Sequence, residues 1–124
     1  LGLIPGYAGP RRPPRLVGRG RALELLLVGH QISAEEAWRI GLVNRVVPDA
    51  RLEEETMALA ARLARGPRVA YRYMKRNMNA AESASLKDML DLEAWHHTRT
   101  GMTEDHREAA RAFVEKREPR FKGR

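Results

Sequence analysis

One segment of this 124-residue chain, LVNRVV at Leu42–Val47, has the β-branched composition of a strand, and Pro48 closes it. Elsewhere the sequence predicts helices and loops. A lone strand has no partner for its backbone hydrogen bonds. We therefore expect either that this strand is an edge added to another sheet, or that sheet-forming sequence is missing from this chain. The predicted fold class is mainly α with one short strand.

The segment before this strand begins with residues that disfavour regular structure. Four glycines and four prolines fall within the first eighteen residues, so residues 1–14 are predicted to be irregular. From Arg15 the prolines stop, and a short apolar helix is expected to end at Gly29. Ser33, followed by Glu36, has the spacing of a capping box, which predicts a helix over 34–40 that ends at Gly41.

After Pro48 the pattern predicts four helices. The first carries the apolar stripe Leu52, Thr56, Leu59 and Leu63 and stops at Gly66. The other three helices are expected over 69–81, from Ser85 to Gly101, and from Thr103 to Pro119. The positions expected to face inward or to form an apolar side are Val69, Tyr73, Met74, Met78, Leu86, Met89, Leu90, Trp95, Ala110, Phe113 and Val114. The stripe and the apolar sides of the next two helices exceed what a short chain covers by itself. We therefore expect association through residues 49–124.

Composition excludes several function classes. Hydrophobic residues are 43% of the chain and charged residues 31%, which is typical of a globular protein, and no apolar run is long enough to span a bilayer. No membrane interaction and a cytoplasmic location are expected. The net charge of +7 favours an anionic partner. Nucleic acid is not expected, because LVNRVV is too short for a recognition helix and aromatic residues are few.

The residues alone predict no catalytic or metal centre. No phosphate-binding glycine motif occurs, and the carboxylates lie on charged helix faces beside Arg or Lys. His96 and His97 are adjacent on a predicted helix, so their side chains diverge by about 100° and cannot easily share an ion. His30 and His106 stand alone. All four histidines are expected to be structural or solvated, and no metal is predicted.

Four patterns in order resemble the enoyl-CoA hydratase/isomerase (crotonase) family: LGLIPGYAG, PRLVGRGRALEL, ISAEEAWRIGLVNRVVP and AFVEKREPRFKGR. The resemblance covers practically the whole chain and matches the family's C-terminal half. It implies the last part of the α/β crotonase (ClpP/crotonase-like) spiral fold, with residues 1–48 ending the spiral core. Residues 49–124 would then be the helical region through which members form trimers and dimers of trimers.

The resemblance also implies a reaction, the syn addition of water across the double bond of a 2-enoyl-CoA. Two glutamates handle the water, and two backbone amides polarise the thioester carbonyl. In the family LGLIPG follows closely after a catalytic Glu, so the chain is expected to begin downstream of it and to be inactive alone. An isomerase or another acyl-CoA enzyme of the family is the first alternative. A non-catalytic helical oligomerisation module is the second.

Four residues carry implied roles. Gly6 matches the glycine whose backbone amide touches the reacting water, and Pro5 positions it. Phe113 and Lys116 match positions that reach the CoA nucleotide, commonly that of a neighbouring subunit. One helical turn separates them, so they can share a face; the alternatives are a core Phe113 and a solvated Lys116. CoA is part of the acyl-CoA substrate, and no separate cofactor is implied.

One departure from the family pattern affects the opening loop. Where members usually have GGTQRLPR, this chain has AGPRRPPR, so that Pro10 replaces a Thr and Pro13 a Leu. Two prolines, Pro13 and Pro14, would then lie at the start of the following helix, where proline is tolerated.

Overall fold

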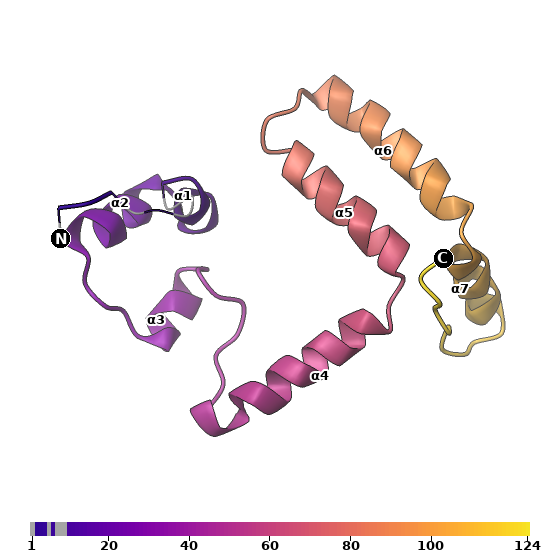
Figure 1. Cartoon of the computed structure of the whole chain (residues 1–124), viewed down its shortest axis with the longest axis horizontal. Coiled ribbons are helices and arrows are strands. Elements are labelled where there is room, and N and C mark those ends of the chain that lie inside the picture. The colour runs from indigo at the N-terminus through magenta and orange to yellow at the C-terminus, as the bar shows by residue number, and fades with distance from the viewer. Residues whose placement is uncertain (1, 5, 7–9) are drawn as a thin grey trace. The chain divides into compact units, whose positions relative to one another are not determined.

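The structure is a computed structural model that describes residues 2–4, 6 and 10–124. In these residues the elements are α1 (Arg12–Val17), α2 (Arg19–Val28), α3 (Ala34–Arg39), the 3-10 helix η1 (Asp49–Arg51), α4 (Leu52–Ala64), α5 (Arg68–Ala80), α6 (Leu86–Gly101) and α7 (Glu104–Val114) (Figure 1). The chain divides into two compact units, residues 1–52 and 53–124. The predicted roles of residues 1–48 and 49–124 stay predictions.

The first unit begins with two helices where one was expected. Helix α1 starts at Arg12 and carries two prolines in its first turn, Pro13 and Pro14, where missing N–H groups cost nothing. The expectation that residues 12–14 are irregular is therefore wrong. Gly18 has φ of 82°, and this left-handed residue separates α1 from α2. Helix α2 ends, as predicted, at Gly29 with φ of 67°.

The core of the first unit is small. Val17, Ala22 and Ile40 are buried together, and Leu25, Ile32 and Leu42 pack against them. The predicted cap of α3 is confirmed, because the backbone N–H of Glu36 donates to Ser33 Oγ at 3.1 Å. The Glu36 carboxylate accepts hydrogen bonds from Arg39, which lowers its pKa.

The predicted strand at residues 42–47 is wrong, because no strand occurs in the described part of the chain. The backbone N–H groups of Leu42 and Val43 donate to the Ala37 carbonyl, at 2.8 and 3.3 Å, and so close the end of α3. The Leu42 side chain packs on the small core. Without a neighbouring strand in the described residues, this β-branched segment has no ladder to join.

In the second unit, helix α4 contains no buried residue. Three members of the predicted stripe are exposed: Leu52 by 57%, Leu59 by 40% and Leu63 by 50%. The stripe exists, but in this chain it packs against nothing that buries it.

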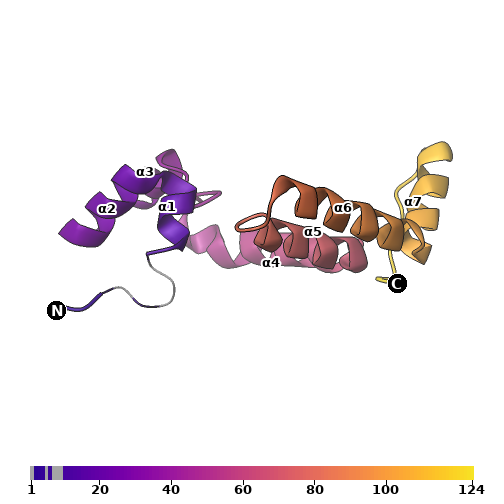
Figure 2. The same cartoon turned by 90° about the horizontal axis from the view of Figure 1, so that it is seen from above.

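Helices α5 and α6 lie side by side (Figures 1 and 2). Tyr73 and His96 are buried between them with ring centroids 4.3 Å apart, and His96 Nδ1 is hydrogen-bonded to Asn77 Oδ1. The structural role predicted for His96 is therefore confirmed, and His97 is exposed. Met74 and Met78, expected inward, are exposed by 58% and 72%. The apolar positions Leu86, Leu90 and Trp95 on α6 are also exposed.

Helix α7 begins at a cap predicted from the sequence, with the His106 N–H donating to Thr103 Oγ1 at 3.0 Å. Its buried residues are Asp105 and Ala112, whereas Phe113 and Val114, assigned to the apolar side, are exposed by 85% and 79%. The helix therefore turns its final apolar pair outward. Among the described helices none is long and apolar enough to cross a membrane.

Candidate functional site

The end of α7 holds two of the four residues implicated by sequence. Phe113 lies in the last turn and is 85% exposed, so the alternative that it is a core residue is wrong for this chain. Lys116 is exposed and follows the helix, which ends at Val114. The prediction that both residues share a helical face is wrong for that reason. The Lys116 backbone N–H still donates to the Phe113 carbonyl at 3.2 Å, which keeps the two residues adjacent.

Lys116 has an unusual backbone. Its φ is 53°, the left-handed conformation, and no other non-glycine residue in the described part of the chain has a positive φ. Glycine normally occupies this position after a helix, because a Cβ makes the left-handed conformation unfavourable. Glu115, the carboxylate next to it, is bound to Arg117 at 2.6 Å. The Arg117 N–H also donates to the Ala112 carbonyl at 3.0 Å, so the left-handed residue closes the end of α7 as a helix cap. Capping explains the backbone conformation of Lys116, but neither capping nor pairing with Glu115 accounts for a lysine side chain at this position.

The residues that follow Lys116 fold back along α7; we call residues 117–124 the C-terminal strap. Asp105, 4% exposed, fastens its far end: its carboxylate accepts from the backbone N–H groups of Lys122 and Gly123, at 2.7 and 2.9 Å. The Asp105 N–H donates to the Arg124 carbonyl at 3.1 Å. Arg68 of α5 donates to the Lys122 carbonyl at 3.0 Å. The strap is thus tied to both α7 and α5.

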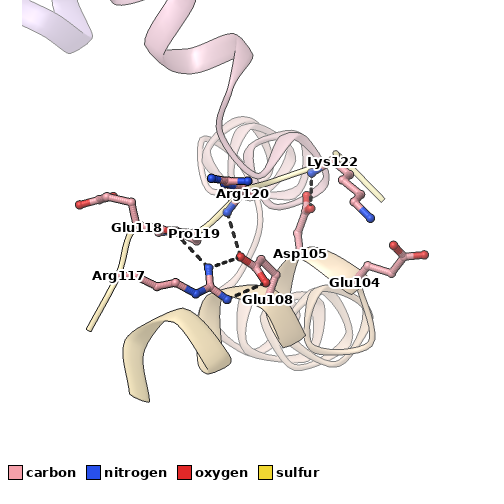
Figure 3. Close-up of a pocket in the computed structure, with 8 residues that line it drawn as sticks. All are labelled: Glu104, Asp105, Glu108, Arg117, Glu118, Pro119, Arg120 and Lys122. Atoms are coloured by element: carbon pink, nitrogen blue, oxygen red, sulfur yellow. Dashed lines mark hydrogen bonds and ion pairs between the residues drawn. The ribbon is translucent and has the colours of Figure 1, made fainter. Parts of the chain in front are cut away.

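Glu108 fastens the near end of the strap (Figure 3). The Arg117 guanidinium donates to both of its carboxylate oxygens, at 2.6 and 3.2 Å, and the Arg120 backbone N–H donates at 3.1 Å. These bonds, first the one from Arg117, lower the pKa of Glu108 from 4.5 to about 2. The same contact raises the pKa of Arg117. Because Arg117 follows Lys116 directly, the ion pair between Arg117 and Glu108 holds the backbone next to Lys116 against α7.

A hollow of about 640 Å³ lies between α7 and the strap, lined by charged side chains of both signs (Figure 3). Three of its carboxylates are engaged: Glu104 with Arg124, Asp105 with the strap backbone and Glu108 with Arg117. Glu108, whose pKa is lowered, is a poor proton donor. The contacts of these three carboxylates hold the strap against α7.

The other two predicted site residues belong to the opening loop. Gly6 is exposed, and nothing lies within 4 Å of the position that a Cβ would take. Pro5 lies outside the described residues, so its predicted role stays a prediction, as does that of Gly6. In the described part of the chain no group of three or more His, Cys, Asp or Glu side chains gathers as metal ligands do.

Sequence reasoning missed the residues that organise this site. Nothing local in the sequence shows that residues 122 and 123 return to Asp105. Gly123 is a second example. Its φ is 77°, a conformation that favours glycine, and a Cβ there would have to displace the end of the Arg68 side chain. The sequence offered one signal of this close approach, which is the presence of a glycine in a segment rich in Arg and Lys.

Comparison with known proteins extends over the whole chain. The family model described as enoyl-CoA hydratase/isomerase matches residues 1–124. The chain is 40% identical, over its full length, to the 1,2-epoxyphenylacetyl-CoA isomerase of Escherichia coli, of which it covers 47%. It is 38% identical to the crotonyl-CoA hydratase of Syntrophomonas wolfei over 98% of the chain and 46% of that protein.

Solved structures agree. An enoyl-CoA hydratase subunit from Geobacillus kaustophilus has a TM-score of 0.92 at 42% identity, covering 99% of this chain and 48% of its own. An enoyl-CoA hydratase from Bacillus anthracis has a TM-score of 0.91 at 39% identity, with 99% and 48% covered. The chain thus spans about half the length of these relatives. The shared length does not say which half, so its placement in the C-terminal half stays a prediction. The match over all 124 residues and the common fold make this chain a member of the enoyl-CoA hydratase/isomerase family.

Proposed function

We propose that the protein carrying this chain is an acyl-CoA enzyme that adds water across the double bond of 2-enoyl-CoA thioesters. Family membership supports an acyl-CoA substrate, and the hydratases among the relatives support the hydration reaction. In this proposal Gly6 presents its backbone amide to the reacting water and Pro5 positions it. The two glutamates that handle the water are supplied by sequence outside this chain. CoA arrives as part of the substrate.

The observation that carries the proposal on this chain is the end of α7. Phe113 is held outward, and Lys116 is kept in a conformation that glycine would adopt more cheaply. Backbone strain that a fold retains is a recognised mark of a ligand site. CoA carries a 3′-phosphate and a diphosphate, so its nucleotide end suits an aromatic ring beside an ammonium group. We propose that Phe113 packs on the adenine and that Lys116 binds phosphate.

Steady-state kinetics test this assignment. In the protein that carries this chain, Lys116→Ala should raise the KM for crotonyl-CoA about tenfold and leave kcat nearly unchanged, because the contact is equal in the ground and transition states. The rise should shrink with added salt. It should also shrink for a crotonyl thioester of CoA that lacks the 3′-phosphate. Arg107→Gln, at an exposed cation on α7, is the control and should leave KM unchanged.

An isomerase of the same family is the second candidate. The observation that favours it is the 40% identity, over the full chain, to a relative named as an isomerase. Incubating the protein with a 2-enoyl-CoA and a 3-enoyl-CoA in separate assays distinguishes the two. A hydratase forms the 3-hydroxyacyl-CoA from the 2-enoyl substrate, whereas an isomerase interconverts the two enoyl thioesters.

We also propose that the protein associates with copies of itself through residues 49–124, as a trimer or a dimer of trimers. The exposed stripe of α4 supports this, because three leucines spaced along one helix are costly to leave in water. This assembly would place Phe113 and Lys116 beside the CoA of a neighbouring subunit. A cytoplasmic location remains a prediction.

A further inference from the structure

A second cationic surface lies on the α5–α6 pair; we call it the arginine–aromatic cluster. It consists of Arg72, Tyr73 and Arg76 on α5 and Trp95 and Arg99 on α6. The Arg72 and Arg76 guanidinium carbons lie 5.3 and 5.7 Å from the centre of the same Tyr73 ring. The Arg99 guanidinium carbon lies 5.5 Å from the centre of the Trp95 ring.

The cluster has a rigid base. The Tyr73 ring is 93% buried (7% exposed) and packs on His96, and Trp95 meets it edge-on with centroids 6.0 Å apart. Arg99 also hydrogen-bonds to the Tyr73 hydroxyl, and this bond lowers the pKa of that hydroxyl. The aromatic rings therefore bring three guanidinium groups together, and all three arginines are exposed.

None of these three arginines has a carboxylate partner among the described residues. Elsewhere arginines hold carboxylates, as Arg39 holds Glu36, Arg117 holds Glu108 and Arg124 holds Glu104. The acidic residues of α6 that could approach the cluster are engaged, Asp88 with Ser85 and Asp91 with Lys87.

The remaining acidic residue of α6 is Glu93, which lines a groove of the same helix pair together with Tyr73 and His96. None of the three arginines lines that groove. The cluster therefore gathers three cations around one buried ring, and none of them is ion-paired with an acidic residue of α6.

We propose that the arginine–aromatic cluster is a binding site for the diphosphate group of a small-molecule ligand. Guanidinium groups present paired N–H donors that match phosphate oxygens, and a planar fork held on a ring loses little entropy on binding. Three guanidinium groups match a ligand with two linked phosphates better than they match a ligand with a single phosphate. A nucleoside diphosphate and inorganic pyrophosphate share this chemistry. The half-exposed Trp95 favours the nucleotide, because its indole can also contact a base.

Titration of the purified protein with pyrophosphate and, separately, with ADP tests the proposal. Trp95 is one of two tryptophans in this chain, so Trp38→Phe leaves Trp95 as the only tryptophan that this chain contributes to the fluorescence. Both ligands should give a saturable change that weakens with salt, and orthophosphate should bind more weakly. Tighter binding of ADP than of pyrophosphate identifies a nucleotide as the source, and equal binding identifies the diphosphate alone.

Variants decide whether the cluster is responsible. Arg72→Gln, Arg76→Gln and Arg99→Gln should each weaken binding about tenfold, the loss of one charge-assisted contact. Arg99→Lys, which keeps the charge but loses the paired N–H donors of the guanidinium group, should also weaken binding. Arg107→Gln on α7 removes the same charge elsewhere and should bind as the parent does. Circular dichroism confirms that the variants are folded. Absence of pyrophosphate binding, or equal weakening by Arg107→Gln, overturns the proposal.

Discussion

At the scale of single residues, the site depends on side chains whose partners lie far along the chain. Asp105 binds residues 122 and 123, and Glu108 binds residues 117 and 120. The sequence indicated Phe113 and Lys116 through their resemblance to a family pattern. It could not indicate that Asp105 is buried, because burial there depends on the return of the strap.

Replacing Asp105 by Asn should detach the end of the strap. The amide keeps one acceptor oxygen but turns an N–H₂ donor toward a backbone N–H donor, either that of Lys122 or that of Gly123. Because the group is buried, we expect a loss of about 1 to 3 kcal/mol in unfolding free energy. Chemical denaturation measures it. Glu104→Gln, at an exposed neighbouring carboxylate, should cost under about 1 kcal/mol; an equal cost for both would contradict a special role for Asp105.

Glu108 predicts a pH dependence. Its pKa falls from 4.5 to about 2 in the folded chain, so its stabilising contribution is present above pH 4.5 and is lost as the pH falls toward 2. Thermal unfolding of the parent and of Glu108→Gln should differ at neutral pH and converge near pH 2. A Tm difference that persists unchanged at the lowest pH would show that Glu108 acts through packing rather than charge.

At the scale of elements, the starts of capped helices could be predicted from the sequence, but what each segment packs against could not. Ser33, Ser85 and Thr103 each accept the backbone N–H three residues on, as short-range capping patterns predict. The break at Gly18 was missed, because a glycine inside a helical pattern does not by itself show where a helix ends. The strand at 42–47 was wrong for the opposite reason: its composition is that of a strand, but pairing needs a partner the composition does not supply.

Thr103→Ala measures the contribution of one such cap. The change removes the hydroxyl that receives the His106 N–H and also donates to the Thr100 carbonyl at 2.7 Å. We expect a loss of about 1 kcal/mol in unfolding free energy. Thr103→Ser, which keeps the hydroxyl, should recover most of the loss. If serine restored nothing, the methyl group rather than the cap would account for the effect.

At the scale of the whole molecule, the two units differ in what they leave exposed. The first unit has a small core of its own, whereas helix α4, most of which belongs to the second, buries no residue. The sequence predicted both the stripe on α4 and its need for a partner, since periodicity is local information. It could not show which side chains of α5 and α6 face each other. That choice depends on how Tyr73, Asn77 and His96 fit together between two helices.

Association through this stripe has a direct test. Leu59→Glu and Leu63→Glu each place a charge where we propose that another copy packs, and should shift the protein to smaller species in analytical ultracentrifugation. Glu53→Gln, at an exposed position on the same helix, is the control. A parent protein that stays monomeric at high concentration would contradict the proposed assembly.

The central proposal is that Lys116, the left-handed residue at the end of α7, binds a CoA phosphate, and Lys116→Gly tests it most directly. Glycine relieves the backbone strain, so the unfolding free energy should rise by about 0.5 to 1 kcal/mol. In the same preparation the KM for crotonyl-CoA should rise about tenfold with kcat nearly unchanged, because the ammonium is lost. A variant that is more stable and yet binds the substrate as well as the parent would contradict the account.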